Sequence, residues 1–265
     1  MRIEYGFYPR GKKKALTMSY DDGHIHDRRL VGILNQYHIK GTFHLNSGFF
    51  GREHIVKPDE VRELYEGHEV SVHTLNHPYL DMLPKDTLLH EVLEDKSNLE
   101  KLVGYPVRGM SYPYGAYNEE IIRNCRLLGM EYARTCEDNP RFSIPGDFMK
   151  WGPTCHHNNG IMDKLEFFKN PAPRVVMPLF YIWGHSQEFH RMNNWELMEE
   201  FCKAASHDEE VWYATNIEIK DYITALRGLV FSADQRIVHN PWGQSVWISA
   251  DKEPVEIKPL QTVSL

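Results

Sequence analysis

The chain has 265 residues, of which 42% are hydrophobic and 25% are charged, a composition typical of a soluble globular protein. Its 30 Lys and Arg residues and 37 Asp and Glu residues give a formal net charge of −7. The only basic run, at 10–14, is more typical of a solvated turn than of a phosphate-binding surface, so we expect neither a nucleic-acid nor a membrane partner. The length suits one large domain, such as an α/β barrel, or two small ones.

The sequence has no segment typical of targeting or membrane insertion. The first 14 residues lack the apolar core of a signal peptide, and the most apolar stretch, 175–183, is short and contains a proline. The four cysteines have no C-x-x-C spacing, which favours free thiols in a reducing compartment. We therefore expect a cytoplasmic protein, or a periplasmic or secreted one if a leader has been removed.

Apolar segments suited to β-strands alternate with segments of helical character along most of the chain. The expected strands are 15–20, 39–45, 68–73, 108–112, 131–135, 148–154, 175–184 and 211–214. The expected helices are 27–37, 58–66, 84–103, 118–128, 161–168, 194–205 and 218–226. Seven or eight strand–helix units predict an α/β fold, a deformed (β/α) barrel around a parallel sheet.

The last part of the chain has a different pattern. Segments 244–249 and 254–257 alternate between apolar and polar residues and are bounded by turn residues. We therefore expect a barrel domain over 1–228, and a small β-strand extension over 229–265 that packs on the barrel.

Two adjacent carboxylates end the first expected strand, in the segment ALTMSYDDGH. Asp21 and Asp22 repel each other when both are ionised, so the pair marks either an ordinary turn or a site that holds a cation. His73 and His77 follow the third expected strand at positions i and i+4. In a helical turn this spacing puts both imidazoles on one face, although two unrelated surface histidines would look the same.

Both motifs follow strands at the end of the barrel where active sites are built. One aspartate and two histidines would leave a coordination position of a metal ion open, as a catalytic site requires. The second aspartate would then remain free as a base.

Two later segments also follow expected strands. The loop GMSYPYGAYN, at 109–118, could form a wall of a cleft and present backbone N–H groups, or it could be an ordinary loop. In the segment LFYIWGHSQEF, at 179–189, His185 could face the metal as a general acid, or it could be a packed loop histidine.

The order of these motifs resembles the polysaccharide deacetylases of carbohydrate esterase family four, which share the chitooligosaccharide-deacetylase homology domain. The segment TMSYDDG at 17–23 resembles the family's T-F-D-D-G motif, and HTLNH at 73–77 matches its H-[ST]-x-x-H motif. The segments SYPYG at 111–115 and IWGH at 182–185 are similar to its third and fifth motifs. The resemblance covers about residues 10–225.

The resemblance implies a reaction and a role for each motif residue. Asp22, His73 and His77 would bind one divalent metal ion, most often zinc and sometimes cobalt or nickel in the family. Asp21 would be the general base that activates a water, and His185 would protonate the departing amine. The products would be acetate and a free amino sugar.

The resemblance also implies residues that bind the substrate or the oxyanion. The backbone N–H of Tyr114 would stabilise the oxyanion, with Tyr112 and Trp183 nearby in the third and fifth motifs. Trp151, in a segment faintly similar to the fourth motif, would be a pocket wall.

Two departures from the family pattern indicate a divergent member. Ser111 stands where the family has an arginine that orients the base, which leaves Arg108 and Arg134 as alternatives. Lys150 stands where an acid would tune the catalytic histidine.

The resemblance favours removal of acetyl groups, most often N-acetyl groups, from an amino-sugar oligosaccharide or polysaccharide. An amidohydrolase of the same barrel type that acts on a small amide or ureide is the nearest alternative. A non-catalytic carbohydrate-binding barrel is another, and the 12% of aromatic residues would suit it.

Overall fold

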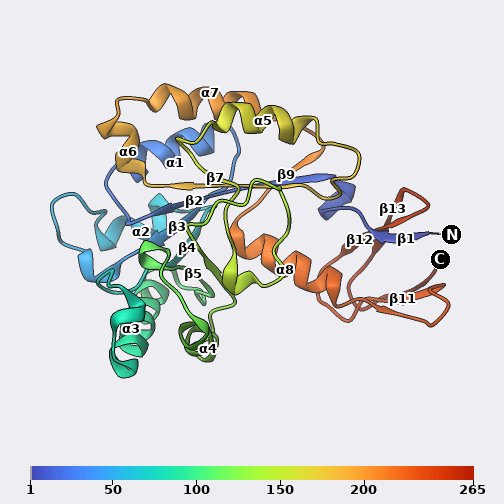
Figure 1. The fold of residues 1–265 in the computed structure, drawn as a ribbon, viewed down its shortest axis with the longest axis horizontal. Helices are drawn as coiled ribbons and strands as arrows, with labels where there is room; N and C mark the ends of the chain where they lie inside the picture. The colour runs from blue at the N-terminus through green and yellow to red at the C-terminus, as the bar shows by residue number, and fades with distance from the viewer. Residues whose placement is uncertain (1) are drawn as a thin grey trace.

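Eight parallel strands form the centre of the molecule in the computed structural model, which describes residues 2–265 (Figure 1). They are β2 (Lys14–Asp21), β3 (Thr42–Leu45), β4 (Glu69–Val72), β5 (Gly109–Ser111), β6 (Tyr132–Arg134), β7 (Cys155–His156), β8 (Leu179–Gly184) and β9 (Val211–Tyr213). The order across the sheet is β6-β5-β4-β3-β2-β8-β7, and β9 pairs with β2. The predicted α/β barrel class is confirmed.

The segment between β6 and β8 closes the sheet into a deformed barrel. The Trp151 N–H donates to the Ala133 carbonyl (3.1 Å), and the Trp151 carbonyl accepts from the Thr135 N–H (3.0 Å). The Thr154 N–H donates to the Tyr181 carbonyl (2.6 Å). The strand predicted at 148–154 is wrong in position. Residues Phe148–Lys150 form a 3-10 helix, because the Asp147 side chain accepts the Met149 N–H, and the strand β7 begins only at Cys155.

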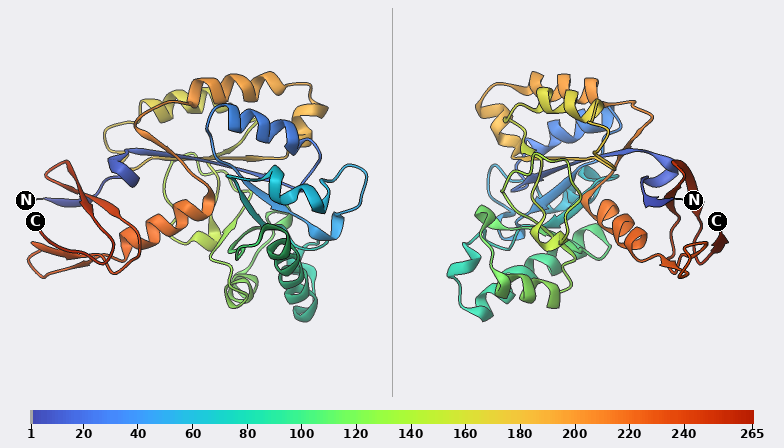
Figure 2. Two further views of the ribbon diagram at one scale, coloured as in Figure 1. Left: turned by 180° about the vertical axis from the view of Figure 1, so that it is seen from behind. Right: turned by 45° about the vertical axis from the view of Figure 1, so that its right-hand side comes forward.

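Helices cover the sheet on both sides (Figures 1 and 2). They are α1 (Asp27–Gln36), α2 (Val61–Leu64), α3 (Lys85–Val103), α4 (Glu119–Leu127), α5 (Ile161–Lys169), α6 (Ser186–Arg191), α7 (Trp195–Ala205) and α8 (Asn216–Arg227). The helices α1, α5 and α7 lie on one side of the sheet, and α3 and α4 lie on the other. The sequence did not predict α6, which continues directly from β8. Among residues 2–265, no helix has the length and apolar character needed to cross a membrane.

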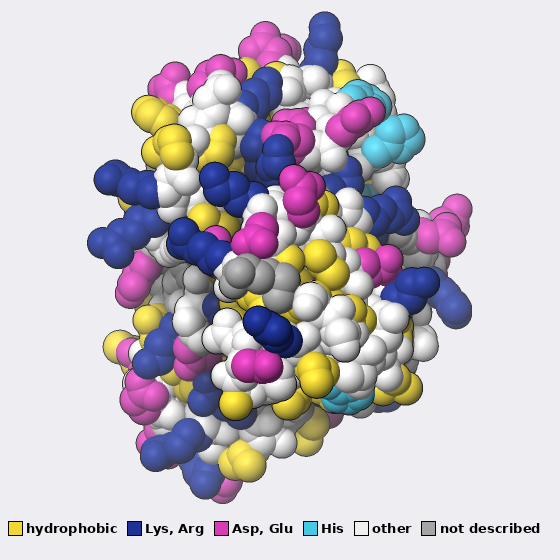
Figure 3. Space-filling model, turned by 90° about the vertical axis from the view of Figure 1, so that its right-hand side faces the viewer, with side chains coloured by type: hydrophobic (Ala, Val, Ile, Leu, Met, Phe, Trp, Pro, Cys, Tyr) yellow, Lys and Arg dark blue, Asp and Glu magenta, His cyan; other side chains and the backbone are white. Residues whose placement is uncertain are grey.

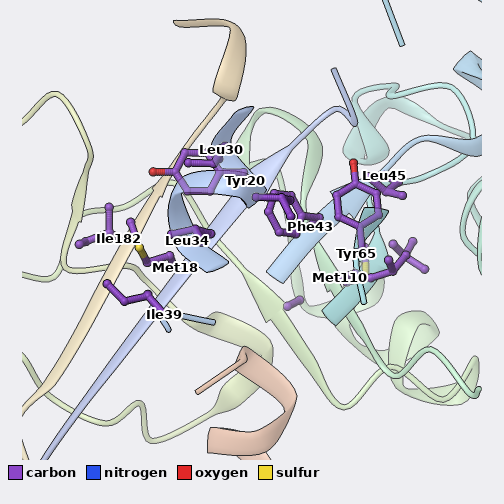
Figure 4. Close-up of a cluster of buried hydrophobic side chains, with 14 of the residues drawn as sticks. Met18, Tyr20, Leu30, Leu34, Ile39, Phe43, Leu45, Tyr65, Met110 and Ile182 are labelled. Carbon is purple, nitrogen blue, oxygen red and sulfur yellow. The ribbon is translucent and has the colours of Figure 1, made fainter. Parts of the chain in front are cut away.

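The main core lies between the sheet and these helices (Figure 4). Every residue of β2 is buried, because helices cover both faces of a parallel sheet. Met18, Tyr20, Phe43 and Ile182 are fully buried within this core. Removing one such side chain from water contributes about 1.5–3 kcal/mol, so this packing fixes the strand ends that carry the polar residues described below.

The C-terminal residues form short antiparallel strands: β10 (Val230–Phe231), β11 (Ile237–His239), β12 (Val246–Ala250), β13 (Glu253–Ile257) and β14 (Thr262–Ser264). The strand β1 (Ile3–Tyr5) pairs with β12, so the first residues of the chain lie with the C-terminal strands (Figure 2). Tyr222 of α8 packs in their core, and its hydroxyl donates to the Phe7 carbonyl at 2.7 Å. Cationic and anionic side chains are interspersed on this face (Figure 3).

Candidate metal centre and acid–base site

Asp22, His73 and His77, called the first trio below, come together at the carboxyl ends of β2 and β4. Asp22 Oδ1 lies 3.8 Å from His73 Nε2 and 3.9 Å from His77 Nε2. Asp22 has a φ of 78°, a left-handed conformation that is rare outside glycine and is found at functional sites. The side chain of Gln187 donates to the other oxygen of Asp22 at 3.2 Å and so orients the carboxylate.

The hydrogen bonds of His73 leave its Nε2 free to bind a metal. Its Nδ1 lies 2.7 Å from the Ser111 hydroxyl and 3.1 Å from the Ser111 carbonyl. The hydroxyl donates its own proton to Asp21 and the carbonyl can only accept, so the ring proton of His73 is on Nδ1. Burial lowers the pKa of His73 to about 3, and the imidazole is therefore neutral at neutral pH. Metal-binding histidines typically have this arrangement, with the second ring nitrogen bonded to a carbonyl or a carboxylate.

His73 and His77 do not lie in a helical turn, as their spacing suggested. Thr74 and His77 have φ values of 65° and 55°, and the Thr74 hydroxyl accepts the His77 N–H at 3.2 Å. The side chain of Asn46 donates to the Thr74 carbonyl at 2.8 Å and holds this loop in place. The two imidazole rings therefore come together because the segment between them forms a tight loop, in which Thr74 and His77 have left-handed backbone conformations.

The first trio fits a divalent transition metal. Its three potential ligand atoms lie within 4.8 Å of one another, and two imidazoles with one carboxylate form a donor set that suits zinc, cobalt or nickel. Three protein ligands also leave a coordination position for a water or a substrate oxygen.

Asp21 lies beside the first trio but faces a different partner. Its Oδ2 forms an ion pair with the Arg134 guanidinium, and its Oδ1 accepts from the Ser111 hydroxyl at 3.3 Å. Burial raises the pKa of Asp21, but the charge and hydrogen bond of Arg134, together with His44 and His185, outweigh this effect and keep the pKa below its ordinary value. Asp21 is therefore ionised at neutral pH.

Of the two arginines considered as alternatives to the one that the third motif lacks, Arg134 of β6 is the one that contacts Asp21. Both Arg134 and Asp21 are buried, and the guanidinium also lies over the Trp183 ring, 4.3 Å from its centroid. Arg108 points elsewhere and pairs with Asp221 at 2.5 Å.

His185 follows β8 and lies on the other side of Asp22, with its Nε2 4.0 Å from Asp22 Oδ2. Its Nδ1 is 3.2 Å from Glu188 Oε1. Burial lowers the pKa of His185, but the Glu188 carboxylate, together with Asp21 and Asp22, outweighs burial and raises it.

The acid that partners His185 is Glu188 of α6, which the sequence analysis missed. The signal that could have found it is the i, i+3 spacing of His185 and Glu188, because these positions are neighbours on a helix. Lys150 has no such role, since it is exposed and pairs with Glu119 at 2.5 Å.

Tyr114 stands at the edge of the first trio with a φ of 58°. Its ring stacks on Tyr79 with centroids 3.8 Å apart, and it meets His77 edge-on at 4.5 Å. Among residues 2–265, no acceptor pairs with the Tyr114 backbone N–H. That N–H is therefore available for a substrate.

The other aromatic residues predicted for the site lie in two different places. Trp183 is partly exposed and packs between Arg134 and His185, next to the site. Tyr112 and Trp151 are buried. The Tyr112 hydroxyl donates to the Met149 carbonyl at 3.0 Å, and Trp151 packs against Phe148 and Tyr181, so the structure does not bring these two residues to the site surface.

Comparison with known proteins connects this geometry to one family. Residues 9–133 match the family model described as polysaccharide deacetylase. The peptidoglycan-N-acetylglucosamine deacetylase PgdA of Listeria monocytogenes is 28% identical over 134 residues, which are 49% of this chain and 28% of that protein. A chitooligosaccharide deacetylase of Sinorhizobium fredii is 24% identical over 138 residues, 50% of this chain and 61% of that protein. The chain thus spans less than two thirds of these relatives.

Solved structures show the same fold. A crystal structure from Mycobacterium smegmatis, named as a polysaccharide deacetylase, aligns with a TM-score of 0.65 at 17% identity and covers 85% of this chain and 96% of that chain. A peptidoglycan N-acetylglucosamine deacetylase aligns with a TM-score of 0.53 at 15% identity, over 78% of this chain and 92% of that one. At these identities the likeness establishes the deformed barrel.

Proposed function

We propose that this chain, a divergent member of the polysaccharide deacetylase family, hydrolyses the acetamide of an N-acetylated amino-sugar oligosaccharide or polysaccharide. The observation that carries the proposal is the placement of an ionised carboxylate (Asp21), paired with Arg134, beside the first trio, with His185 Nε2 4.0 Å from Asp22 Oδ2. A hydrolase needs a base and an acid on either side of the reacting carbonyl, whereas a protein that only binds sugar needs neither.

The first trio would hold the metal ion, for which zinc is the first choice and cobalt or nickel the alternatives. When bound there, the ion would polarise the acetyl carbonyl and lower the pKa of a water. The Nδ1–H of His73 is anchored on Ser111, which keeps its Nε2 directed at this position.

Asp21 would accept a proton from the attacking water. Arg134 and Ser111 hold its two oxygens, so the carboxylate is oriented before the substrate arrives. The carbonyl oxygen becomes negatively charged in the transition state, and the backbone N–H of Tyr114 would donate to it.

His185 would donate its proton to the nitrogen as the C–N bond breaks. The raised pKa of His185 favours the protonated ring, and the contact with Glu188 fixes the orientation of that ring. Water and the acetamide are thereby converted into a free amine and acetic acid, which ionises to acetate. Asp21 ends with a proton from the water, and His185 ends without the proton that it gave to the nitrogen.

The stacked rings of Tyr79 and Tyr114 support a carbohydrate substrate. About half of each side chain is exposed, at 47% and 54%, directly beside His77. Such a pair presents an apolar surface to the C–H face of a sugar ring next to the reacting acetamide.

The test is release of acetate by the purified chain loaded with Zn²⁺ or Co²⁺. N-acetylglucosamine oligomers and peptidoglycan fragments are the substrates, and acetate and free amine are both quantified. We expect the two products in equal amounts, and no product after chelation of the metal. A chain that holds its metal and releases no acetate from any acetylated sugar would contradict the proposal and favour a binding protein.

A further inference from the structure

Three more potential metal ligands converge behind His185, separate from the first trio. His156 ends β7, His157 follows it, and Glu188 lies on α6; these three are called the second trio below. Glu188 Oε2 lies 2.8 Å from His156 Nε2 and 3.1 Å from His157 Nε2. The three ligand atoms lie within 4.8 Å of one another, as they do in the first trio.

The second trio contains buried polar atoms that lack a partner in hydrogen-bond geometry among the described residues. Among residues 2–265, neither ring nitrogen of His157 nor Oε2 of Glu188 has a partner with hydrogen-bond geometry. The ring of His157 is fully buried, and a buried polar group without a partner is costly, at about 1–3 kcal/mol. A cation between the ligand atoms would pair with both His157 Nε2 and the carboxylate.

The separations in the second trio are slightly shorter than those between two ligands of one coordinated ion. Zinc–nitrogen bonds of about 2.0–2.1 Å in a tetrahedral site place two ligand atoms roughly 3.3 Å apart. The second trio comes closer to that separation than the first, whose corresponding distances are 3.8 and 3.9 Å.

The surrounding residues hold His157 in place. The ring stacks on Phe189 with centroids 4.1 Å apart. A Cβ atom at Gly184 would lie 2.0 Å from His157 Nδ1, so only glycine at this position leaves room for the imidazole. The Trp183 ring packs edge-on against His156 at 5.0 Å. The side chains therefore converge before any ion arrives.

We propose that His156, His157 and Glu188 bind a second divalent metal ion of the zinc, cobalt and nickel class. Two imidazole nitrogens and one carboxylate oxygen are a donor set that these ions prefer. Glu188 Oε1 contacts His185 Nδ1 at 3.2 Å, so an ion on Oε2 would lock Glu188 and, through it, the ring of His185. This positioning role rests on the proposed deacetylase function, whereas binding of the ion does not.

The second ion should bind more weakly than the first. His156 Nδ1 accepts the backbone N–H of Asn158 at 3.2 Å, so in the metal-free chain the ring proton is on Nε2. Before Nε2 can bind an ion, the proton must move to Nδ1 and the bond from Asn158 must break. The first trio needs no such change, because His73 already carries its proton on Nδ1.

The experiment counts metal ions. The chain is loaded with Zn²⁺ or Co²⁺, desalted and measured by mass spectrometry of the metal. We expect two equivalents in the wild type, one in His156→Gln, one in His77→Ala and two in the control His190→Gln, a histidine of α6 outside both trios. A chelator titration should remove the equivalent that depends on His156 first.

If the wild type binds only one equivalent of metal, and His156→Gln binds the same amount, the proposal is overturned. Glu188→Gln has nearly the same shape as the native side chain and provides a second variant if His156→Gln fails to fold, which thermal unfolding will show. The count requires no acetate release. If the chain binds two equivalents of metal but releases no acetate, the proposed function is refuted while the proposal of a second metal ion is supported.

Discussion

Asp21 and Asp22 are neighbours in the sequence but have different surroundings. Asp21 is the last residue of β2 and points into the barrel, where Arg134 neutralises its charge. Asp22 has a positive φ, and its side chain points toward the histidines of the first trio. Arg134 offsets the charge of Asp21, and the proposed metal ion would offset that of Asp22, so the two adjacent carboxylates would not repel each other strongly.

Glu188→Gln tests the role of the carboxylate beside His185. Glutamine keeps the size of the side chain but not the carboxylate that contacts and orients His185 Nδ1, so we expect kcat to fall about 10-fold to 100-fold with little change in KM. Steady-state kinetics on an N-acetylglucosamine oligomer measures both constants. Lys150→Gln is the matched control and should behave as the wild type, because Lys150 pairs only with Glu119. Equal kcat values for the two variants would remove Glu188 from the mechanism.

The sequence could predict which residues come together as the proposed metal ligands and base, but not the side chains that contact them. Asp21, Asp22, His73 and His77 lie in compact motifs at strand ends, and strand ends meet at one edge of a parallel sheet. Arg134 comes from a strand with no motif of its own. Its contact with Asp21 depends on how the barrel closes, and local spacing carries no information about that closure.

At the level of elements, long apolar runs predicted the strands and helices well, and short polar elements were missed. The segment 186–191 forms α6, but six residues are too few to show a helical period. The segment 148–154 is apolar enough for a strand, but the cap from Asp147 starts a 3-10 helix there instead.

Gly184→Ala tests the packing of β7 against β8. A methyl group at residue 184 would lie 2.0 Å from His157 Nδ1, so His157 and its loop must move. Overpacking of this kind typically costs 1–3 kcal/mol, and we expect a clear fall in Tm. Gly146→Ala is the control, because a Cβ there meets no atom within 4 Å. If Gly184→Ala has the same Tm as the control, the contact between residue 184 and His157 is looser than the 2.0 Å separation indicates.

At the scale of the whole molecule, two long-range arrangements lay beyond prediction from sequence. The pairing of Ile3 with Ala250 joins the two ends of the chain, and no local pattern predicts such a pairing. The other arrangement centres on Glu69, at the opposite end of β4 from the metal site. Its carboxylate accepts from Thr42 of β3, Tyr132 of β6 and the N–H of Ile217 in α8, and so connects four elements.

Glu69 should make the stability of the protein depend on pH. Burial raises the pKa of Glu69 to about 7, although its three donors oppose this effect. The folded state therefore holds a proton that the unfolded state loses near the ordinary glutamate pKa of about 4.3. It follows that the free energy of unfolding should decrease as the pH rises from about 4.5 to about 7.

Glu69→Gln removes this contribution. Relative to the wild type, the variant should gain stability as the pH rises from 5 to 7.5, as measured by urea unfolding at both values. The comparison between variant and wild type cancels the effects of Asp27 and Asp95, whose pKa values burial also raises to about 7. A difference in unfolding free energy that does not change with pH would mean that Glu69 is ionised throughout.

In the proposed mechanism, Asp21 acts as a base beside a metal ion that it does not bind. The most direct test is Asp21→Asn, with metal content and acetate release measured on the same sample. We predict that the variant keeps the metal bound by the first trio and loses about 10²–10⁴-fold in kcat, the range that a general base contributes. Normal turnover with the metal retained would exclude Asp21 as the base, and loss of that metal together with the activity would show that Asp21 is a metal ligand.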